Sequence, residues 1–397
     1  MNLPFLDLAS PGFSTRSDEI KIARATSWCA RTPFGLAVLR HREAGLLLRD
    51  KRLRQGSHNW PDTHNLKGGF AEFWKRSLIS TQGTLHKQLR QVAISALSPE
   101  FIHNLQPEFD TIADILAYDL ACKSSPEFMM DFSKPFAGQA IAILLGMEAQ
   151  DWERVSYDAS NLGLAMGIDC KKHESTFNAA YERLAALTDE LINKVRSGDL
   201  KRGFVKRIVE EFDASGIKDH QALQDLIVIA IFGGVDTTKS QLGFLIDLFI
   251  KHPDQWQLLR SDKSLIANAI EEAIRANPTT TWASREATET FVFGDTEIRK
   301  GEVLHIMVHA SARDPSICEN PQFNITLRRK MHFGFGGGAH HCIGHLVART
   351  DMASAINALS THLKSFTYSD MPKFLPDSGN TSPLKLPLAI ERQVLSN

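Results

Sequence analysis

Residues 333–344 read FGFGGGAHHCIG, and no other stretch says as much about the chain. Twelve residues hold five glycines, two adjacent histidines and Cys342. Glycine lets a backbone adopt positive φ and pass close to a bulky neighbour, because it has no Cβ. Residues 343–363 carry helical periodicity, which places the cysteine at the predicted N-terminus of a helix. Backbone N–H groups and the helix dipole favour a thiolate there.

Several kinds of site use such residues. Residues 334–339 match the dinucleotide pattern G-x-G-x-x-A, but the preceding LRRKMH is no buried strand. The G-K-[ST] end of a phosphate loop is absent. Zinc needs four ligands, and His340, His341 and Cys342 supply at most three. A cysteine nucleophile beside a histidine stays possible but leaves the glycines unexplained. A thiolate held by turn amides against a large planar group is how cysteine binds a haem iron axially.

The stretch resembles the haem-binding loop of the cytochrome P450 family. The family pattern F-G-x-G-x-H-x-C-x-G is matched at six positions, which are Phe335, Gly336, Gly338, His340, Cys342 and Gly344. The resemblance implies haem b as cofactor, Cys342 as the axial iron ligand and His340 as a contact of a haem propionate. It covers roughly residues 40–349 and implies a single cytochrome P450 domain over 1–397, with the haem loop at 333–344.

A second motif lies in the helix expected over about residues 221–251. Its sequence IAIFGGVDTTKS places Gly233 and Gly234 in mid-helix, where each glycine costs roughly 1 kcal/mol relative to alanine. Such a cost usually has a packing or functional reason. The motif resembles the oxygen-activating helix of the family, [AG]-G-x-[DE]-T-[TS]. By that resemblance, Asp236 and Thr237 are a catalytic acid–alcohol pair that relays protons, and their presence favours dioxygen over peroxide as oxidant.

Glu272 and Arg275 stand at i, i+3 on one helix face and resemble the buried ion pair that braces the family's core. The family commonly adds an arginine eight residues before the loop phenylalanine. Leu327 occupies that position here, so Arg328 is predicted to be the third partner.

Two buried haem carboxylates need cationic partners. His86 and Arg90 lie at i, i+4 in LHKQLRQ and match the H-x-x-x-R of bacterial family members. Arg285 falls where the family has another propionate arginine. We therefore expect His86, Arg90 and Arg285 to contact the haem.

Composition sets wider limits. The 397 residues are 43% hydrophobic and 23% charged, with a formal net charge of -1, so nothing points to nucleic acid or an anionic membrane. The five cysteines form no C-x-x-C pair, which argues against a disulfide framework and favours a reducing compartment. The N-terminal residues lack a signal-peptide pattern, and no apolar run reaches the roughly 18 residues of a membrane span. A cytoplasmic protein is expected.

Periodicity predicts a mainly α protein with a minor β lobe. Residues 99–275 are mostly helical in pattern, as in 105–120 and in 179–198, which ends at Gly198. Residues 290–308 hold short β-prone runs with predicted hairpin turns at 294–295 and 300–301, and residues 34–40 suggest another strand.

The resemblance implies a haem-thiolate monooxygenase that hydroxylates or O-dealkylates a small or medium, mostly apolar substrate. Electrons are expected from a separate ferredoxin and an NAD(P)H-dependent ferredoxin reductase, which a basic surface near the loop would attract. The residues of that surface are Arg328, Arg329, Lys330, His345 and Arg349. The pocket is predicted to include Phe70, Phe73, Trp74, Ile229, Gly233, Thr281 and Trp282. A peroxide-driven haem-thiolate enzyme and a non-enzymatic haem sensor remain alternatives.

Overall fold

The computed structural model describes residues 3–10, 12–167, 169–377 and 379–393. These residues divide into two compact units, which are described separately. The sheet unit consists of residues 1–57, 268–342 and 374–382, and the helical unit consists of residues 58–267, 343–373 and 383–397. The mainly α architecture with minor β structure that the sequence predicts is confirmed. The single domain over 1–397 stays a prediction.

The sheet unit is built on five strands in the order β1-β2-β7-β4-β3. Their bounds are β1 (Cys29–Thr32), β2 (Gly35–Val38), β3 (Leu53–Gln55), β4 (Trp282–Ala287) and β7 (Val303–Met307). Strand β7 pairs parallel to β2 and antiparallel to β4, so Leu304 lies opposite both Leu36 and Arg285. The unit also holds α1 (Asp18–Thr26), α2 (His41–Leu47), α14 (Val308–Ser311), η6 (Gly338–His340) and nearly all of α13 (Ile266–Ala276).

Of the two predicted hairpins, one is confirmed and one is wrong. Strands β5 (Phe291–Phe293) and β6 (Thr296–Ile298) pair antiparallel around Gly294, whose φ of 62° suits glycine. The turn at residues 300–301 does not join a hairpin, because β7 pairs with β2 and β4 and not with β6. The local sequence pattern identifies the strands, but β2 and β4, which lie elsewhere in the chain, are the pairing partners of β7. The strand predicted within residues 34–40 is β2.

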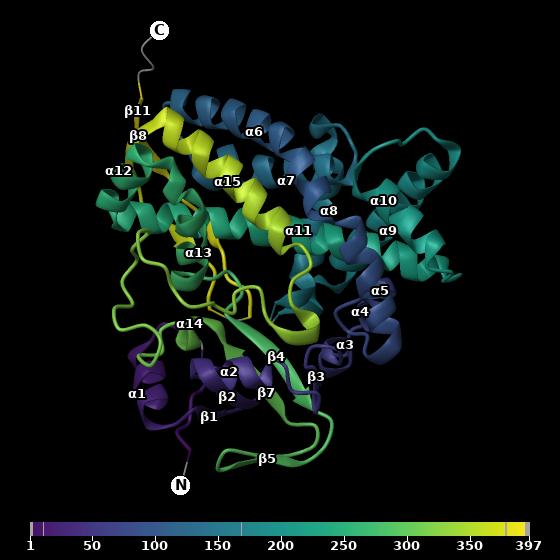
Figure 1. The fold of residues 1–397 in the computed structure, drawn as a ribbon, viewed down its shortest axis with the longest axis vertical. Helices are drawn as coiled ribbons and strands as arrows, with labels where there is room; N and C mark the ends of the chain where they lie inside the picture. The colour runs from purple at the N-terminus through teal and green to yellow at the C-terminus, as the bar shows by residue number, and fades with distance from the viewer. Residues whose placement is uncertain (1–2, 11, 168, 378, 394–397) are drawn as a thin grey trace. The chain divides into compact units, whose positions relative to one another are not determined.

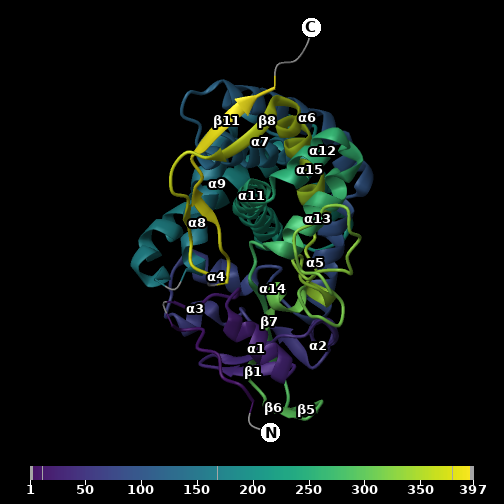
Figure 2. The same cartoon turned by 90° about the vertical axis from the view of Figure 1, so that its left-hand side faces the viewer.

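The helical unit surrounds α11 (His220–Lys251), which Figure 2 shows nearly end-on. The other main helices are α3 (Trp60–Thr63), α4 (Gly69–Arg76), α5 (Gly83–Ala96), α6 (Pro99–Cys122), α7 (Lys134–Leu145), α8 (Glu153–Gly163), α9 (Glu174–Ser197), α10 (Gly203–Ala214), α12 (Pro253–Ser261) and α15 (His345–His362). Helix α15 packs along α6, as Figure 1 also shows.

Shorter elements connect these helices. A π-helical turn, η1 (Met129–Ser133), precedes α7, and 3-10 turns occur at η2 (Ala149–Trp152), η3 (Leu164–Met166), η4 (Cys170–His173) and η5 (Lys263–Leu265). Strand β8 (Leu363–Tyr368) pairs antiparallel with β11 (Leu388–Arg392), and β9 (Lys373–Phe374) pairs with β10 (Pro383–Lys385). None of the helices in the described ranges is long and apolar enough to cross a membrane.

Helix α11 begins and ends where its sequence requires. The carboxylate of Asp219 accepts hydrogen bonds from the backbone N–H groups of Gln221 and Ala222, which caps the first turn. The helix stops at Lys251, two residues before Pro253, whose ring disfavours helical backbone in the residue ahead of it. Buried apolar side chains lie on all sides of α11, so it forms the core of its unit.

One buried acid on α15 contacts a side chain of α11. Asp351 is buried, and its Oδ2 accepts a hydrogen bond of 3.5 Å from the hydroxyl of Thr238. Its Oδ1 has no hydrogen-bond partner within the described ranges. Burial raises the pKa of Asp351 well above its ordinary value of 3.8, because a charged carboxylate would lose its hydration there.

We predict that replacing Asp351 with Asn stabilises the protein increasingly as pH rises. The folded state raises the pKa, so folding retains a proton that the unfolded chain loses above about pH 4. The wild type therefore loses stability as pH rises toward the folded pKa, and Asn, which does not titrate, avoids that loss. Urea unfolding at pH 5.5 and pH 8 measures the effect. Asp119→Asn, at an exposed position on α6, is the control. A difference between Asp351→Asn and wild type that does not change with pH would contradict the assignment.

Candidate active site

The cysteine loop of the sheet unit is closed by its own backbone. The N–H of Gly336 donates to the carbonyl of Phe333 at 2.8 Å, and the N–H of Cys342 donates to the carbonyl of Phe335 at 2.9 Å. Gly336 and Gly338 have φ of 68° and 67°, in the left-handed region that favours glycine. The backbone bonds therefore fix the position of Cys342, whose side chain is exposed.

Three glycines of the loop lie close to protein neighbours. A Cβ on Gly338 would overlap the carbonyl oxygen of Leu48, just after α2, and one on Gly337 would approach the Leu48 Cδ1 to 3.1 Å. A Cβ on Gly334 would overlap the side chain of Ile274 on α13. The loop therefore packs closely against the end of α2 and against α13. The sequence interpretation, close approach to a flat ligand, did not identify these contacts.

Helix α15 starts at His345, three residues after Cys342, with Gly344 as its N-cap. The predicted helix after the cysteine is confirmed, although it begins two residues later than the periodic stretch. The predicted propionate contact, His340, ends the short turn η6 ahead of Cys342. None of the five cysteines, all within the described ranges, forms a disulfide.

Arg285 on β4 is a buried cation with neutral partners. Its guanidinium donates to the side-chain oxygen of Gln55 at 3.2 Å and to the backbone carbonyls of Ser284 and Gly337 at 2.9 Å each. Burial lowers the pKa of Arg285 to about 10, because no carboxylate among these partners offsets the lost hydration. A buried guanidinium of this kind suits an anionic group, such as a haem carboxylate. The exposed thiol of Cys342 and this cation, both in the sheet unit, have the donor chemistry that haem requires.

In the helical unit, α5 carries His86 and Arg90 one turn apart. His86 is buried, and its pKa is lowered from 6.5, first by burial and then by the positive charge of Arg90. The imidazole is therefore neutral at pH 7 and offers one N–H donor. Arg90 is half-buried. Their contact with a haem carboxylate stays a prediction.

The glycines of α11 serve two purposes. A Cβ on Gly234 would lie 2.8 Å from Cδ1 of Ile141, so this glycine allows α7 to approach α11. Gly233 faces open space, since a Cβ at this position would have no atom of the described residues within 4 Å. The hydroxyl of Thr237 donates to the Gly233 carbonyl at 2.6 Å. The adjacent acid, Asp236, accepts a hydrogen bond of 3.1 Å from the hydroxyl of Ser160 on α8.

The predicted ion pair of the sheet unit is present, and its third partner differs from the prediction. Arg275 Nε lies 2.6 Å from Glu272 Oε2, and both side chains are almost fully buried. The third partner is Arg329, whose Nη2 lies 3.4 Å from Glu272 Oε1, and not Arg328, which is exposed. Sequence spacing could not choose between adjacent arginines, because only the course of the loop decides which side chain turns inward.

Most predicted pocket residues of the helical unit are buried among other side chains. The rings of Phe70 and Phe73 on α4 are fully buried and pack against Phe177 and Tyr181 of α9 at centroid distances of 5.0 and 5.2 Å. Trp74 meets the ring of Phe232 edge-on at 6.1 Å. Ile229 is also buried, whereas Gly233 is exposed. These ring contacts join α4 to α9 and to α11, and contact with a substrate stays a prediction.

The two predicted pocket residues of the sheet unit differ in exposure. Thr281 is fully buried, and its hydroxyl donates to the carbonyl of Gly379 at 2.6 Å. Trp282, on β4, is half-buried, with its ring 5.5 Å from that of His305. Burial lowers the pKa of His305 to about 4, so this imidazole is neutral at physiological pH.

The predicted basic surface is smaller than expected. Arg328 and Lys330 of the sheet unit are exposed, but Arg329 is 15% exposed and bound to Glu272. In the helical unit, Arg349 Nη1 lies 2.7 Å from Nδ1 of His345. Among these five residues, Arg329 has a charge that is partly offset by a carboxylate.

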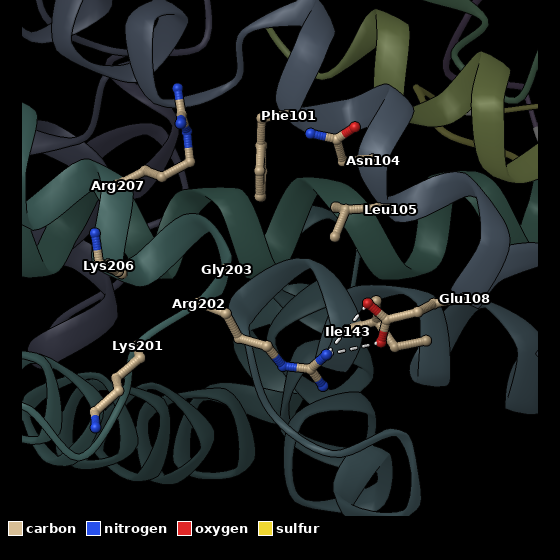
Figure 3. Close-up of a pocket in the computed structure, with 10 residues that line it drawn as sticks. All are labelled: Phe101, Asn104, Leu105, Glu108, Ile143, Lys201, Arg202, Gly203, Lys206 and Arg207. Carbon is tan, nitrogen blue, oxygen red and sulfur yellow. Dashed lines mark hydrogen bonds and ion pairs between the residues drawn. The ribbon is translucent and has the colours of Figure 1, made fainter.

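A surface pocket of about 280 Å³ lies elsewhere in the helical unit and contains none of the predicted site residues (Figure 3). Two of its cations, Arg202 and Arg207, already serve the fold. Arg202 donates to both carboxylate oxygens of Glu108 at 3.2 and 3.0 Å, and Arg207 donates to the Ala96 carbonyl at 2.7 Å, which satisfies the end of α5. We assign no ligand to this pocket.

Comparison with known proteins identifies the family. Residues 164–388 match the family model described as Cytochrome P450. This chain belongs to the cytochrome P450 family. It is 32% identical to luteothin monooxygenase of Streptomyces thioluteus, over 98% of this chain and 96% of that protein. It is 26% identical to the biotin biosynthesis cytochrome P450 of Bacillus subtilis (strain 168), over 90% of each chain.

Solved structures agree on the fold. The chain matches a crystal structure of CalO2 with a TM-score of 0.86 and 22% identity, over 96% of this chain and 99% of that one. It matches P450BioI, solved in complex with a fatty-acid-ligated acyl carrier protein, with a TM-score of 0.85 and 25% identity, over 94% and 98% of the two chains. The chain is a cytochrome P450 monooxygenase, and membership of this family implies a haem-thiolate cofactor.

Sequence reasoning missed the side chains that support the predicted ones. Gln55 and Leu48, which contact Arg285 and the cysteine loop, lie more than two hundred residues away in sequence. Ser160 contacts Asp236 from another helix. No local motif marks these residues, because their roles arise only when distant segments meet.

The adjacent arginines give a direct test of the corrected ion-pair network. Arg329→Met should lower the free energy of unfolding by about 1 to 3 kcal/mol, because the buried carboxylate of Glu272 loses a partner. Arg328→Met, at the exposed neighbour, should change it by less than about 0.5 kcal/mol. Urea titration of the haem-loaded protein, followed by Soret absorbance, measures both. Equal effects of the two substitutions would contradict the assignment of Arg329 as the third partner.

Proposed function

We propose that the chain inserts one oxygen atom of dioxygen into a small or medium, mostly apolar organic molecule, by hydroxylation or O-dealkylation. The family model and the relative that is named a monooxygenase support the reaction class. The observation that carries the dioxygen route lies on α11. The hydroxyl of Thr237 and the open space at Gly233 occur within one turn of that helix, beside the acid Asp236.

In this proposal the chain holds haem through Cys342, and Arg285, His86, Arg90 and His340 hold the haem carboxylates. Phe335, Gly336 and Gly344 shape the loop around the sulfur. When bound, haem with a cysteinate ligand supplies the chemistry that cleaves the O–O bond of dioxygen. Asp236 takes protons from solvent and passes them to the hydroxyl of Thr237, which delivers them to the oxygen being reduced. Glu272, Arg275 and Arg329 maintain the core beside the loop.

The substrate and the redox partner are proposed only as classes of molecule. The predicted pocket residues are Phe70, Phe73, Trp74, Ile229, Gly233, Thr281 and Trp282, and their mostly apolar character supports an apolar substrate. Luteothin, the compound in the name of the 32%-identical relative, is the first member of a binding panel. A ferredoxin and an NAD(P)H-dependent ferredoxin reductase are proposed as electron donors, with Arg328 and Lys330 on the docking surface. The proposed location is the cytoplasm, where thiols stay reduced.

The proposed ligand is tested by Cys342→Ala. The dithionite-reduced wild type with carbon monoxide should show the red-shifted Soret band of thiolate ligation, and the variant should lose it. Cys122→Ala, at the other exposed cysteine, should keep the wild-type spectrum. An unaltered band in Cys342→Ala, or a purified protein that takes up no haem, would end the proposal.

The proposed relay is tested by Thr237→Ala with ferredoxin, reductase and NADH. Product formed per NADH should fall by at least about ten-fold, because general acid–base groups contribute factors of this order or more. Thr237→Ser, which keeps the hydroxyl, should retain most of the coupling. Turnover of the wild type with hydrogen peroxide alone, at the NADH-supported rate, would instead favour a peroxide-driven enzyme.

A further inference from the structure

One carboxylate of the sheet unit is bound by three consecutive side chains from the first segment of the chain. The hydroxyls of Ser14 and Thr15 donate to Oδ2 of Asp377 at 2.7 and 3.2 Å, and Arg16 forms an ion pair with Oδ1. The Asp377 side chain is 9% exposed, and Thr15 is almost fully buried. These four residues, here called the Asp377 cluster, join segments that lie 361 to 363 positions apart.

The first segment is in turn held by α13 and α14. The second terminal nitrogen of Arg16 donates to the side-chain oxygen of Asn277, which follows α13 directly. On α14, Nε2 of His309 accepts a hydrogen bond of 2.8 Å from Nε of Arg313, so its Nδ1 carries the proton. That Nδ1 donates to the carbonyl of Thr15 at 3.2 Å. The donors of the cluster therefore have fixed positions within the sheet unit.

The loop that follows the acid reaches two predicted pocket residues. The carbonyl of Gly379 accepts hydrogen bonds from both the N–H and the hydroxyl of Thr281, at 2.7 and 2.6 Å. The N–H of Thr381 donates to the carbonyl of Thr279 at 2.8 Å. A Cβ on Gly379 would lie 3.9 Å from Cζ2 of Trp282, which is ordinary contact distance. The loop backbone therefore lies against the Trp282 ring at the start of β4.

This loop has little apolar burial of its own. Its large apolar side chains, Phe374 and Leu375, are 38% and 42% exposed. Polar bonds therefore hold the loop, at Asp377 and, after it, at Gly379 and Thr381. Segments with few buried apolar contacts open locally at a low cost in free energy, so loss of the bonds at Asp377 should let the loop move.

We propose that the Asp377 cluster positions the backbone of Gly379 against Trp282, and thereby sets how tightly the enzyme binds molecules large enough to contact that ring. The inference rests on the assignment of Thr281 and Trp282 to the pocket under the proposed function. The cluster takes no part in the reaction and acts on binding. If the loop is in place in only a fraction of molecules, the apparent affinity for such a ligand falls by that fraction.

Two ligands of ferric haem test the proposal without knowledge of the substrate. 4-Phenylimidazole brings a ring that the pocket must accommodate, whereas imidazole is small. Asp377→Ala and Arg16→Met should raise the Kd of 4-phenylimidazole, read from the Soret shift, at least about five-fold, as for a loop in place in about one molecule in five. The Kd of imidazole should change less than about two-fold. Equal changes for both ligands, or none for either, would overturn the proposal.

Arg31→Met is the matched control for Arg16→Met. It removes an ion pair with Glu302 in the same unit, and the two side chains are 46% and 12% exposed against 30% and 9% for Arg16 and Asp377. The Kd values of both imidazoles should stay at their wild-type values in this control. A rise in the 4-phenylimidazole Kd as large as in Arg16→Met would show a general loss of stability and would contradict the proposal.

Backbone hydrogen exchange of the haem-loaded protein gives a readout that needs no ligand. The amides of Leu375 and Thr381, which donate to the carbonyls of Ser382 and Thr279, should exchange at least about ten-fold faster in Asp377→Ala. Ser14→Ala, which removes one hydrogen bond and keeps the ion pair, should give a smaller change in the same direction, and tests the proposal even if Asp377→Ala does not fold. Unaltered exchange at both amides would overturn the positioning role.

Trp282→Ala separates failure of this inference from failure of the pocket assignment. If Trp282→Ala weakens 4-phenylimidazole binding and the cluster variants do not, the pocket assignment stands and the positioning role is wrong. If Trp282→Ala leaves the Kd unchanged, both are wrong. Arg16→Met added to Asp377→Ala should raise the Kd no further, since Arg16 acts through that carboxylate. An additional rise in the double variant would contradict the proposal.

Discussion

The sheet unit depends on the close approach of the cysteine loop to the residue after α2. The backbone of Gly338 passes the carbonyl of Leu48 so closely that no side chain fits between them, and Gly337 packs on the side chain of the same leucine. Backbone hydrogen bonds from Gly336 and Cys342 then close the loop. These backbone bonds fix the position of Cys342, which suits the role of iron ligand proposed for its sulfur.

The same constraint accounts for the cations nearby. Arg285 reaches the carbonyl of Gly337, so it is positioned by the loop that carries the cysteine. Burial among neutral partners is costly for a guanidinium, and the lowered pKa of Arg285 is the sign of that cost. In contrast, Arg275 and Arg329 share the buried carboxylate of Glu272, so their positive charges are partly offset within the protein. Arg275 and Arg285 therefore differ in their surroundings, because Arg275 pairs with a carboxylate and the hydrogen-bond partners of Arg285 are neutral.

In the helical unit, the polar groups along α11 also have specific contacts with other helices. Most side chains of α11 are buried, so few positions on the helix suit polar groups, and the polar side chains that it carries lie at specific positions. Asp351 reaches Thr238 from α15, and Ser160 reaches Asp236 from α8. Gly234 makes room for α7, whereas Gly233 leaves space unfilled. Polar side chains on this helix contact neighbouring helices, so their orientation depends on packing as well as on the local sequence.

The sequence predicted the helix after Cys342, the bounds of α11 within one residue, and the Glu272–Arg275 pair, because each is set by short-range spacing. It also predicted the strands β2, β5, β6 and β7 from local composition. It could not predict that β7 pairs with β2, that Arg329 and not Arg328 turns inward, or that Phe70 and Phe73 pack against α9. Adjacent residues share the same local pattern, and only contacts between segments far apart in the chain distinguish them. The sequence by itself determined the family of this protein, because the cysteine loop and the Gly-Gly-x-Asp-Thr stretch of α11 are local motifs. Tertiary structure alone decided which side chains support those groups, because partners such as Leu48, Gln55 and Ser160 come close only when the chain folds.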